Sequence, residues 1–107
     1  MRVPLDECVP RRLRSELDGI DVNTVAEMGW SGKTNGELIQ LMCSAGFEVL
    51  VTVDQGLPYQ QNIAASSIAL IVLQGASNKF EDLLPLVPSL RQALSSARSG
   101  DVLRISA

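Results

Sequence analysis

Two aspartates, Asp6 and Asp54, are the residues of this sequence best placed to do chemistry. Each follows a short apolar run, Val3–Leu5 or Val49–Val53, that is typical of a β-strand. The carboxyl ends of parallel strands meet at one edge of a sheet, where open α/β folds bind ligands. Carboxylates that gather there repel one another unless a cation neutralises them. Magnesium or manganese, which prefer oxygen ligands, are the expected cations, and either ion can polarise a phosphate and activate water.

Two further acids, Glu37 and Glu7, and the pair itself leave alternatives open. Glu37 is the last residue of the segment Thr34–Glu37, which has the spacing of a helix capping box. It either caps that helix or faces the same crevice as a third ligand. Asp6 and Asp54 either share a site or cap the turns that follow them. Glu7 points away from Asp6 if the strand continues through it.

Polar residues near the two aspartates are candidates for binding substrate. Arg11 and Arg12 follow Asp6 closely and either contact a phosphate or form an ordinary solvated face. Gln60 and Gln61 lie in a polar cluster shortly after Asp54. That cluster is either a turn into a short helix or a set of hydrogen-bonding groups for a metal or substrate.

Composition excludes several kinds of site. The sequence contains no histidine, which removes Ser-His-Asp and Cys-His catalysis and histidine-bound zinc. Cys8 and Cys43 lack the spacing of a metal or redox pair and are expected to be reduced. The net charge of −3 excludes a global basic surface for nucleic acid, so only a local patch can serve. Trp30 either stacks on a base or covers the edge of the core.

The elements that must position these residues alternate between strand and helix patterns. Buried-strand runs occupy 49–53 and 68–73, with shorter strands expected at 3–5, 21–25 and 102–105. Helical stripes occupy 9–17, 34–45 and 80–94, with a kink or split expected at Pro85 and Pro88. Asn78 and Glu81 form a second cap-like pair, and the stripe from 80 to 94 is apolar enough either for a dimer seam or for the core. A short helix is expected after Asp54.

This alternation predicts one α/β domain over residues 1–107, with a mainly parallel sheet of four to five strands and helices on both faces. No apolar run reaches the roughly 18–20 residues that a membrane helix needs. The first residues reach acids too early for a signal peptide, so a cytoplasmic location is expected.

Short segments spread over nearly the whole chain carry a family resemblance: Leu5–Glu7, Pro10–Leu13, Thr24–Val25, Gly29–Trp30, Asn35–Leu38, Val51–Asp54 and Leu57–Asn62. In this order and spacing they resemble a bacterial PIN-like domain family of unknown function. That family is related to PIN nucleases and to the toxins of toxin–antitoxin pairs.

The resemblance implies a three-layer α/β/α sandwich that cleaves RNA with magnesium or manganese held by an acidic pocket. Asp6, Glu37 and Asp54 match the acids expected in that pocket. An antitoxin-like protein would be a natural partner. Relatives usually carry Asn at the position of Cys8, and Gln55 and Gly56 replace a further acid that commonly follows the position of Asp54.

Two other classes of function remain open. Asp54–Pro58 also resembles the Asp-x-x-x-Pro stretch of response-regulator receiver domains, in which Asp54 would accept a phosphoryl group while Asp6 and Glu7 hold magnesium. Receivers use a hydroxyl directly after the fourth strand, where Gln74 lies, and a lysine near the end of the fifth, where Arg104 lies. The third class is an inactive interaction module that keeps the fold and binds a partner.

Overall fold

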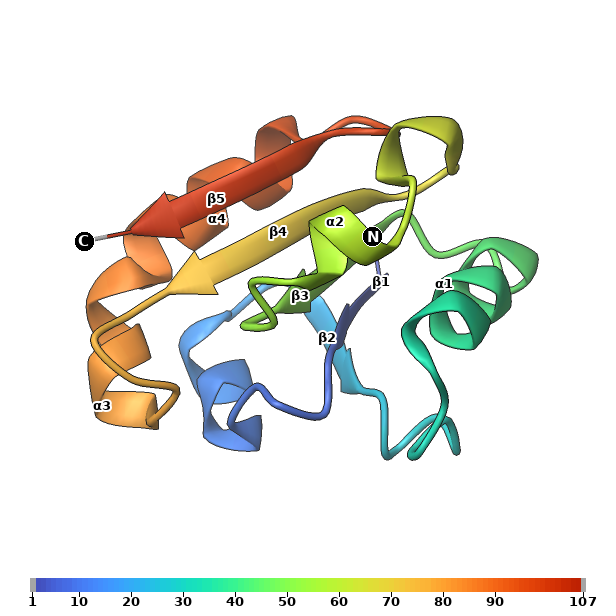
Figure 1. The fold of residues 1–107 in the computed structure, drawn as a ribbon. Coiled ribbons are helices and arrows are strands. Elements are labelled where there is room, and N and C mark those ends of the chain that lie inside the picture. Colours follow the sequence, from blue (N-terminus) through green and yellow to red (C-terminus); the bar gives the residue numbers. More distant parts are fainter. Residues whose placement is uncertain (1, 107) are drawn as a thin grey trace.

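A five-stranded, all-parallel sheet with the order β2-β1-β3-β4-β5 forms the centre of the molecule (Figure 1). The computed structural model describes residues 2–106. The strands are β1 (Arg2–Leu5), β2 (Asp21–Thr24), β3 (Val49–Thr52), β4 (Ala69–Gln74) and β5 (Val102–Ser106). The predicted strands are therefore confirmed, with ends that shift by at most one residue.

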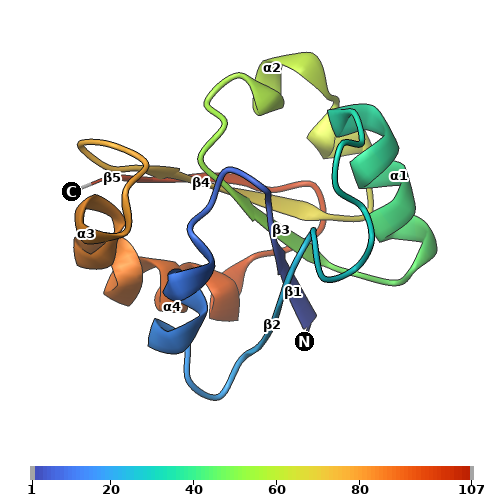
Figure 2. The same cartoon turned by 90° about the horizontal axis from the view of Figure 1, so that it is seen from below.

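Helices cover both faces of this sheet, as Figure 2 shows edge-on. The 3₁₀ helix η1 (Arg11–Glu16) lies on one face with α3 (Phe80–Leu83), η3 (Leu84–Leu86) and α4 (Val87–Ser96). The other face carries α1 (Asn35–Ser44), α2 (Leu57–Gln60) and η2 (Ile63–Ala65). Each face has its own buried apolar cluster, so the predicted three-layer α/β/α arrangement is confirmed.

Pro4 removes one backbone hydrogen bond from the centre of the sheet. The backbone N–H of Asp6 donates to the Val51 carbonyl at 2.9 Å, which crosses from β1 to β3. The nitrogen of Pro4, two residues earlier, points the same way but has no hydrogen to donate. The register between β1 and β3 is therefore the single pair Leu5↔Val51, whereas β1 and β2 pair along four positions from Arg2↔Asp21 to Leu5↔Thr24.

Local signals set both ends of α1. Thr34 caps the helix with its side chain, and Glu37 returns a bond to the Thr34 N–H, which completes the predicted capping box. At the other end Gly46 adopts φ +81°, a conformation that a side chain disfavours. The N–H of Phe47 then reaches the Met42 carbonyl at 3.0 Å, which closes the helix in a Schellman motif.

The prolines divide the last helical stripe as expected. Pro85 lies in the short η3, which separates α3 from α4, and Pro88 lies in the first turn of α4. The predicted cap at Asn78 is wrong, because Lys79 precedes the first helical residue and makes no side-chain cap. Ser77 orders this turn instead, since its hydroxyl binds Asp82 and accepts from the Lys79 N–H. The main apolar residues of the stripe are buried in the domain's own core: Leu83, Leu86, Val87, Leu90 and Leu94.

Candidate functional site

Asp6 and Asp54 lie at the carboxyl edge of the sheet. They follow β1 and β3, and the chain adds β2 on one side of β1 and β3 on the other. Asp6 follows β1, and Asp54 lies two residues beyond the end of β3. These strands are neighbours in the centre of the sheet (Figure 1). In sheets of the order 2-1-3-4-5, the crevice beyond β1 and β3 is the usual place for a ligand. The fold thus brings the two predicted acids to one edge.

A buried hydroxyl connects these acids. The Thr52 Oγ1 donates to Asp6 Oδ2 at 2.8 Å and accepts from the Asp54 backbone N–H at 3.0 Å. Thr52 is fully buried. Side chains alternate along a strand, so Thr52 and Asp54 point to the same side of the sheet, the side that carries α1 and α2. The Asp6 carboxylate lies on that side too, because it meets Thr52.

The Asp54 carboxylate is held by the turn after β3 and by the start of α1. Its Oδ1 accepts from the Gly56 N–H at 2.9 Å, which is the turn-capping role that the sequence left open. Its Oδ2 accepts from the Asn35 side-chain amide at 3.3 Å. That same amide donates to Gln60 Oε1 at 3.0 Å. Asp54 is therefore both a turn cap and a half-buried acceptor that faces α1.

Glu37 performs the capping role. Its Oε1 accepts from the Thr34 N–H at 3.1 Å, and the Thr34 hydroxyl accepts from the Glu37 N–H at 3.2 Å. The hydrogen bond from the Thr34 backbone is the largest cause that lowers the pKa of Glu37. Glu37 lines a separate hollow of about 280 Å³ with Lys33 and Gln40, which does not include Asp6 or Asp54.

The donor set at the carboxyl edge suits a small, hard cation bound by few protein ligands. Within residues 2–106, no three Asp, Glu, Cys or His side chains are grouped so that they could hold a metal ion. Asp6 and Asp54 remain as a pair of carboxylates, with the Asn35 amide beside them. Magnesium commonly keeps several waters and takes only one or two protein carboxylates, so the pair fits that ion.

Cys8 lies beside the acid pair as a neutral thiol. Its Sγ is 3.5 Å from Thr52 Oγ1 and 3.7 Å from Asp6 Oδ2. Burial of the thiol is the main cause that raises the pKa of Cys8, and the charge of Asp6 adds to it. A thiol with a raised pKa is a weak nucleophile at neutral pH.

The arginines predicted to contact phosphate belong to the opposite face. Both are exposed on η1. Arg12 turns toward α3, where its guanidinium lies 4.2 Å from the centre of the Phe80 ring and 3.9 Å from Glu81. The structure therefore does not bring Arg12 together with Asp54.

Gln60 and Gln61 lie close to the acids. Gln60 is bonded to Asn35, and the Gln61 amide packs against Gly36 at the start of α1, 3.5 Å from the position a Cβ would take there. Trp30 packs edge-on against Phe47 with ring centres 5.7 Å apart, so it covers the core edge.

Sequence reasoning missed four polar residues at this edge. Thr52 and Asn35 contact the acids directly, while Gln55 binds the Val53 and Leu73 carbonyls and accepts from Gln74 at 2.7 Å. Thr52 carried a usable signal, because it is the one polar residue in the apolar run 49–53. The other three are amides in loops or at element ends, and no spacing rule marks them.

No family model, no curated protein and no solved structure matches this chain. The helices described within residues 2–106 include none that is long and apolar enough to span a membrane.

Proposed function

We propose that this chain is a PIN-like, magnesium- or manganese-dependent RNA phosphodiesterase, with Asp6 and Asp54 as its metal ligands. One observation carries the proposal: both acids lie at the β1–β3 edge, joined through the Thr52 hydroxyl. That edge is where ligands bind in this sheet order. The family resemblance of the sequence supports the choice of RNA as substrate.

Each nearby residue has a definite task in this mechanism. The cation, when bound, neutralises the two carboxylates, polarises a phosphate oxygen and activates water. Thr52 holds the Asp6 carboxylate in place, and Asn35 does the same for Asp54. We assign Glu37 to the helix cap, where both of its bonds already satisfy it. Arg11 and Arg12 are exposed on η1 at the opposite face, so we assign neither of them a contact with a phosphate held at the acids.

Cleavage of single-stranded RNA with each metal tests the proposal. End-labelled RNA is incubated with the protein and MgCl₂ or MnCl₂, and products are separated by length. Asp6→Asn and Asp54→Asn should each lose cleavage while circular dichroism stays unchanged, because each removes a ligand charge and keeps its shape. Asp18→Asn is the matched control, since Asp18 is an exposed aspartate in the turn before β2. A control variant that also loses cleavage would contradict the assignment.

A second candidate, phosphorylation of Asp54, is favoured by the strand order. Order 2-1-3-4-5 is that of the flavodoxin-like folds, and receiver domains place their phosphorylated aspartate after the third strand, as Asp54 lies here. Two other positions differ: Gln74 binds Gln55, and Arg104 lies over the Tyr59 ring. Glu7, the second acid of that reading, accepts from the Gly32 N–H at 2.8 Å.

Acetyl phosphate with magnesium separates these candidates. A phosphoryl adduct on wild type that is absent from Asp54→Asn, with no RNA cleaved, would establish the second function. Neither adduct nor cleavage would leave an interaction module, with an antitoxin-like protein as its expected partner.

A further inference from the structure

A hollow beside α2 is linked to the acid pair through one of its lining residues, Gln60. Its volume is about 510 Å³, inside the range of roughly 300–1,000 Å³ that small-ligand sites occupy. It is formed by α2, η2 and the first residue of β5, with these lining residues: Pro58, Tyr59, Gln60, Gln61, Ile63 and Val102. Gln60 connects it to the acids, because its side chain binds Asn35, which binds Asp54.

Tyr59 is the most exposed large hydrophobic side chain described within residues 2–106, at 83% of its full area. Its ring contributes nothing to either core cluster. The aromatic ring is therefore open to a ligand that could stack on it. Tyr59 is one of the residues that line the hollow.

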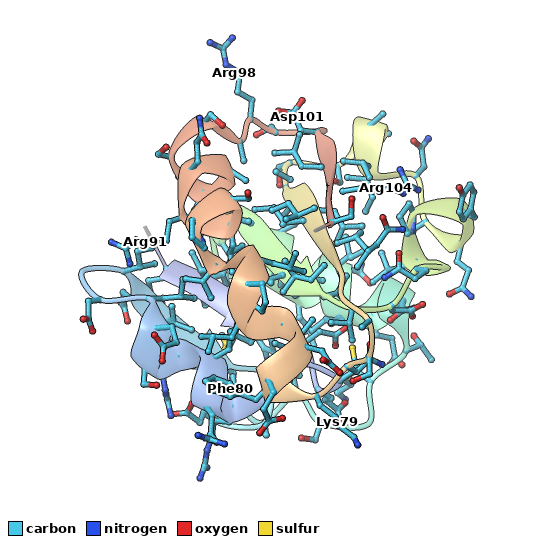
Figure 3. The ribbon with its side chains drawn as sticks, turned by 90° about the vertical axis from the view of Figure 1, so that its left-hand side faces the viewer. Lys79, Phe80, Arg91, Arg98, Asp101 and Arg104 are labelled. Atoms are coloured by element: carbon cyan, nitrogen blue, oxygen red, sulfur yellow. The ribbon has the colours of Figure 1, made fainter. Side chains whose placement is uncertain are left out.

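Arg104 supplies positive charge at the same place. Its guanidinium carbon lies 5.5 Å from the centre of the Tyr59 ring. Figure 3 shows Arg104 on the side of β5 away from α4, Arg91 and Phe80. The three ion pairs found among residues 2–106 involve Arg2, Arg12 and Arg14, so Arg104 keeps its charge available there. In a chain of net charge −3, this local cation gives an anionic ligand a point of attraction.

We propose that the hollow is a base-binding subsite for an unpaired nucleotide of single-stranded RNA, which rests on the proposed function of the acid pair. A base stacks on the free face of Tyr59, Arg104 meets the adjoining phosphate, and the Gln60 and Gln61 amides meet the base edge. Aromatic stacking beside a cation is how proteins hold single strands. Amides can donate and accept hydrogen bonds, which suits a base edge better than a phosphate.

Binding of short labelled oligonucleotides, measured by fluorescence anisotropy without metal, tests the subsite. The probes are a single-stranded RNA, an abasic strand with the same number of phosphates, and a duplex of the same sequence. Wild type should prefer the single strand. Tyr59→Ala should weaken that binding about tenfold, the usual value of one stacked base, without changing binding of the abasic strand. Tyr59→Phe should bind like wild type, because it keeps the ring.

Arginine variants test the charge separately. Arg104→Gln should weaken binding of the RNA and of the abasic strand alike. Arg98→Gln removes the same charge in the turn before β5, where Figure 3 shows it at the end of the molecule away from Lys79, and should bind like wild type. Equal effects of the two arginine variants, or loss of abasic binding in Tyr59→Ala, would overturn the subsite. So would equal affinity for the duplex.

The two proposals fail in different ways. Base-dependent binding with no cleavage keeps the subsite and removes the phosphodiesterase. Cleavage that requires Asp54 and is indifferent to Tyr59 keeps the phosphodiesterase and removes the subsite.

Discussion

At the scale of single residues, Thr52 links the Asp6 carboxylate to the backbone of Asp54. It is a hydroxyl in a strand that is otherwise apolar, and both of its hydrogen bonds go to residues of the candidate site. A valine has nearly the same shape but can neither donate to Asp6 nor accept from Asp54. The exchange therefore isolates the hydroxyl from the packing.

Thr52→Val is expected to lower the free energy of unfolding by about 1–3 kcal/mol, because it leaves the Asp54 N–H and an Asp6 oxygen without a buried partner. It should also weaken magnesium binding, since Asp6 is no longer oriented. Urea denaturation and metal titration measure the two effects. Thr52→Ser keeps the hydroxyl and should retain metal affinity. A valine variant with unchanged affinity would show that Thr52 has a packing role only.

Glu27 gives the fold a predictable response to acid. The Arg14 guanidinium at 2.6 Å and the Thr24 N–H at 3.1 Å lower the pKa of Glu27 from 4.5 to about 2. A carboxyl group with a depressed pKa stabilises the folded state above pH 4.5 and loses that contribution as the pH falls toward 2.

Glu27→Gln should therefore be less stable than wild type at pH 6, and the difference should shrink steadily below pH 4.5. Denaturation curves at several pH values measure this. High salt should also reduce the difference, because the pair is on the surface. A difference that stays constant between pH 6 and pH 3 would contradict the role of the charge.

At the scale of elements, the first turn of α1 joins a helix cap to the candidate site. Thr34 and Glu37 complete the capping box, and Asn35 between them reaches Asp54. The sequence predicted the box from its spacing. It could not predict the Asn35 contact, because that contact depends on where β3 ends relative to the helix.

Variants of Glu37 separate capping from metal binding. Glu37→Gln can still accept from the Thr34 N–H, as glutamine serves in capping boxes, so metal affinity and cleavage should stay close to wild type. Glu37→Ala removes the bond that Glu37 returns to the Thr34 N–H, leaves the Thr34 cap in place, and should lower stability modestly. Thermal unfolding and metal titration provide the readouts. A large loss of metal affinity in Glu37→Gln with unchanged stability would make Glu37 a ligand.

Element boundaries divide into those with strong local signals and those without. Apolar runs identified the longer strands, and Pro85 and Pro88 identified the divided last helix, because proline lacks the N–H that a helix interior needs. The predicted cap at Asn78 was wrong. Asn is a common helix N-cap, but here the hydrogen bonds of Ser77 with Asp82 and Lys79 order the turn.

At the scale of the whole molecule, strand order is what the sequence could not supply. Alternating strands and helices predict a parallel sheet, but the connections do not say which strands become neighbours. The order that places β1 beside β3 is what makes the strand ends before Asp6 and Asp54 neighbours at that edge. The sequence indicated the two acids and the carboxyl edge of the sheet at which they lie. Their connection through Thr52 is visible only in the structure.

The domain is expected to be a monomer in solution without ligand. Leu84 and Tyr59 are the large hydrophobic residues exposed in the part of the chain that the structure describes, and Leu84 is only 39% exposed. Such isolated exposure is too little for a stable dimer interface. Light scattering coupled to size exclusion should give the mass of one chain at micromolar concentration. A dimer that Leu84→Ser dissociates would place a dimer interface on η3.

The missing N–H of Pro4 divides the sheet into two unequal parts. β2 and β1 form a ribbon, β3 to β5 form a slab, and a single register pair joins them. Asp6 belongs to the ribbon and Asp54 to the slab, so the two acids lie on opposite sides of this weakly hydrogen-bonded junction. An ion bound by both carboxylates would therefore link the two parts of the sheet. Amide protons on the facing edges of β1 and β3 should then exchange with deuterium more slowly when the ion is bound, while those between β3 and β4 keep their rates.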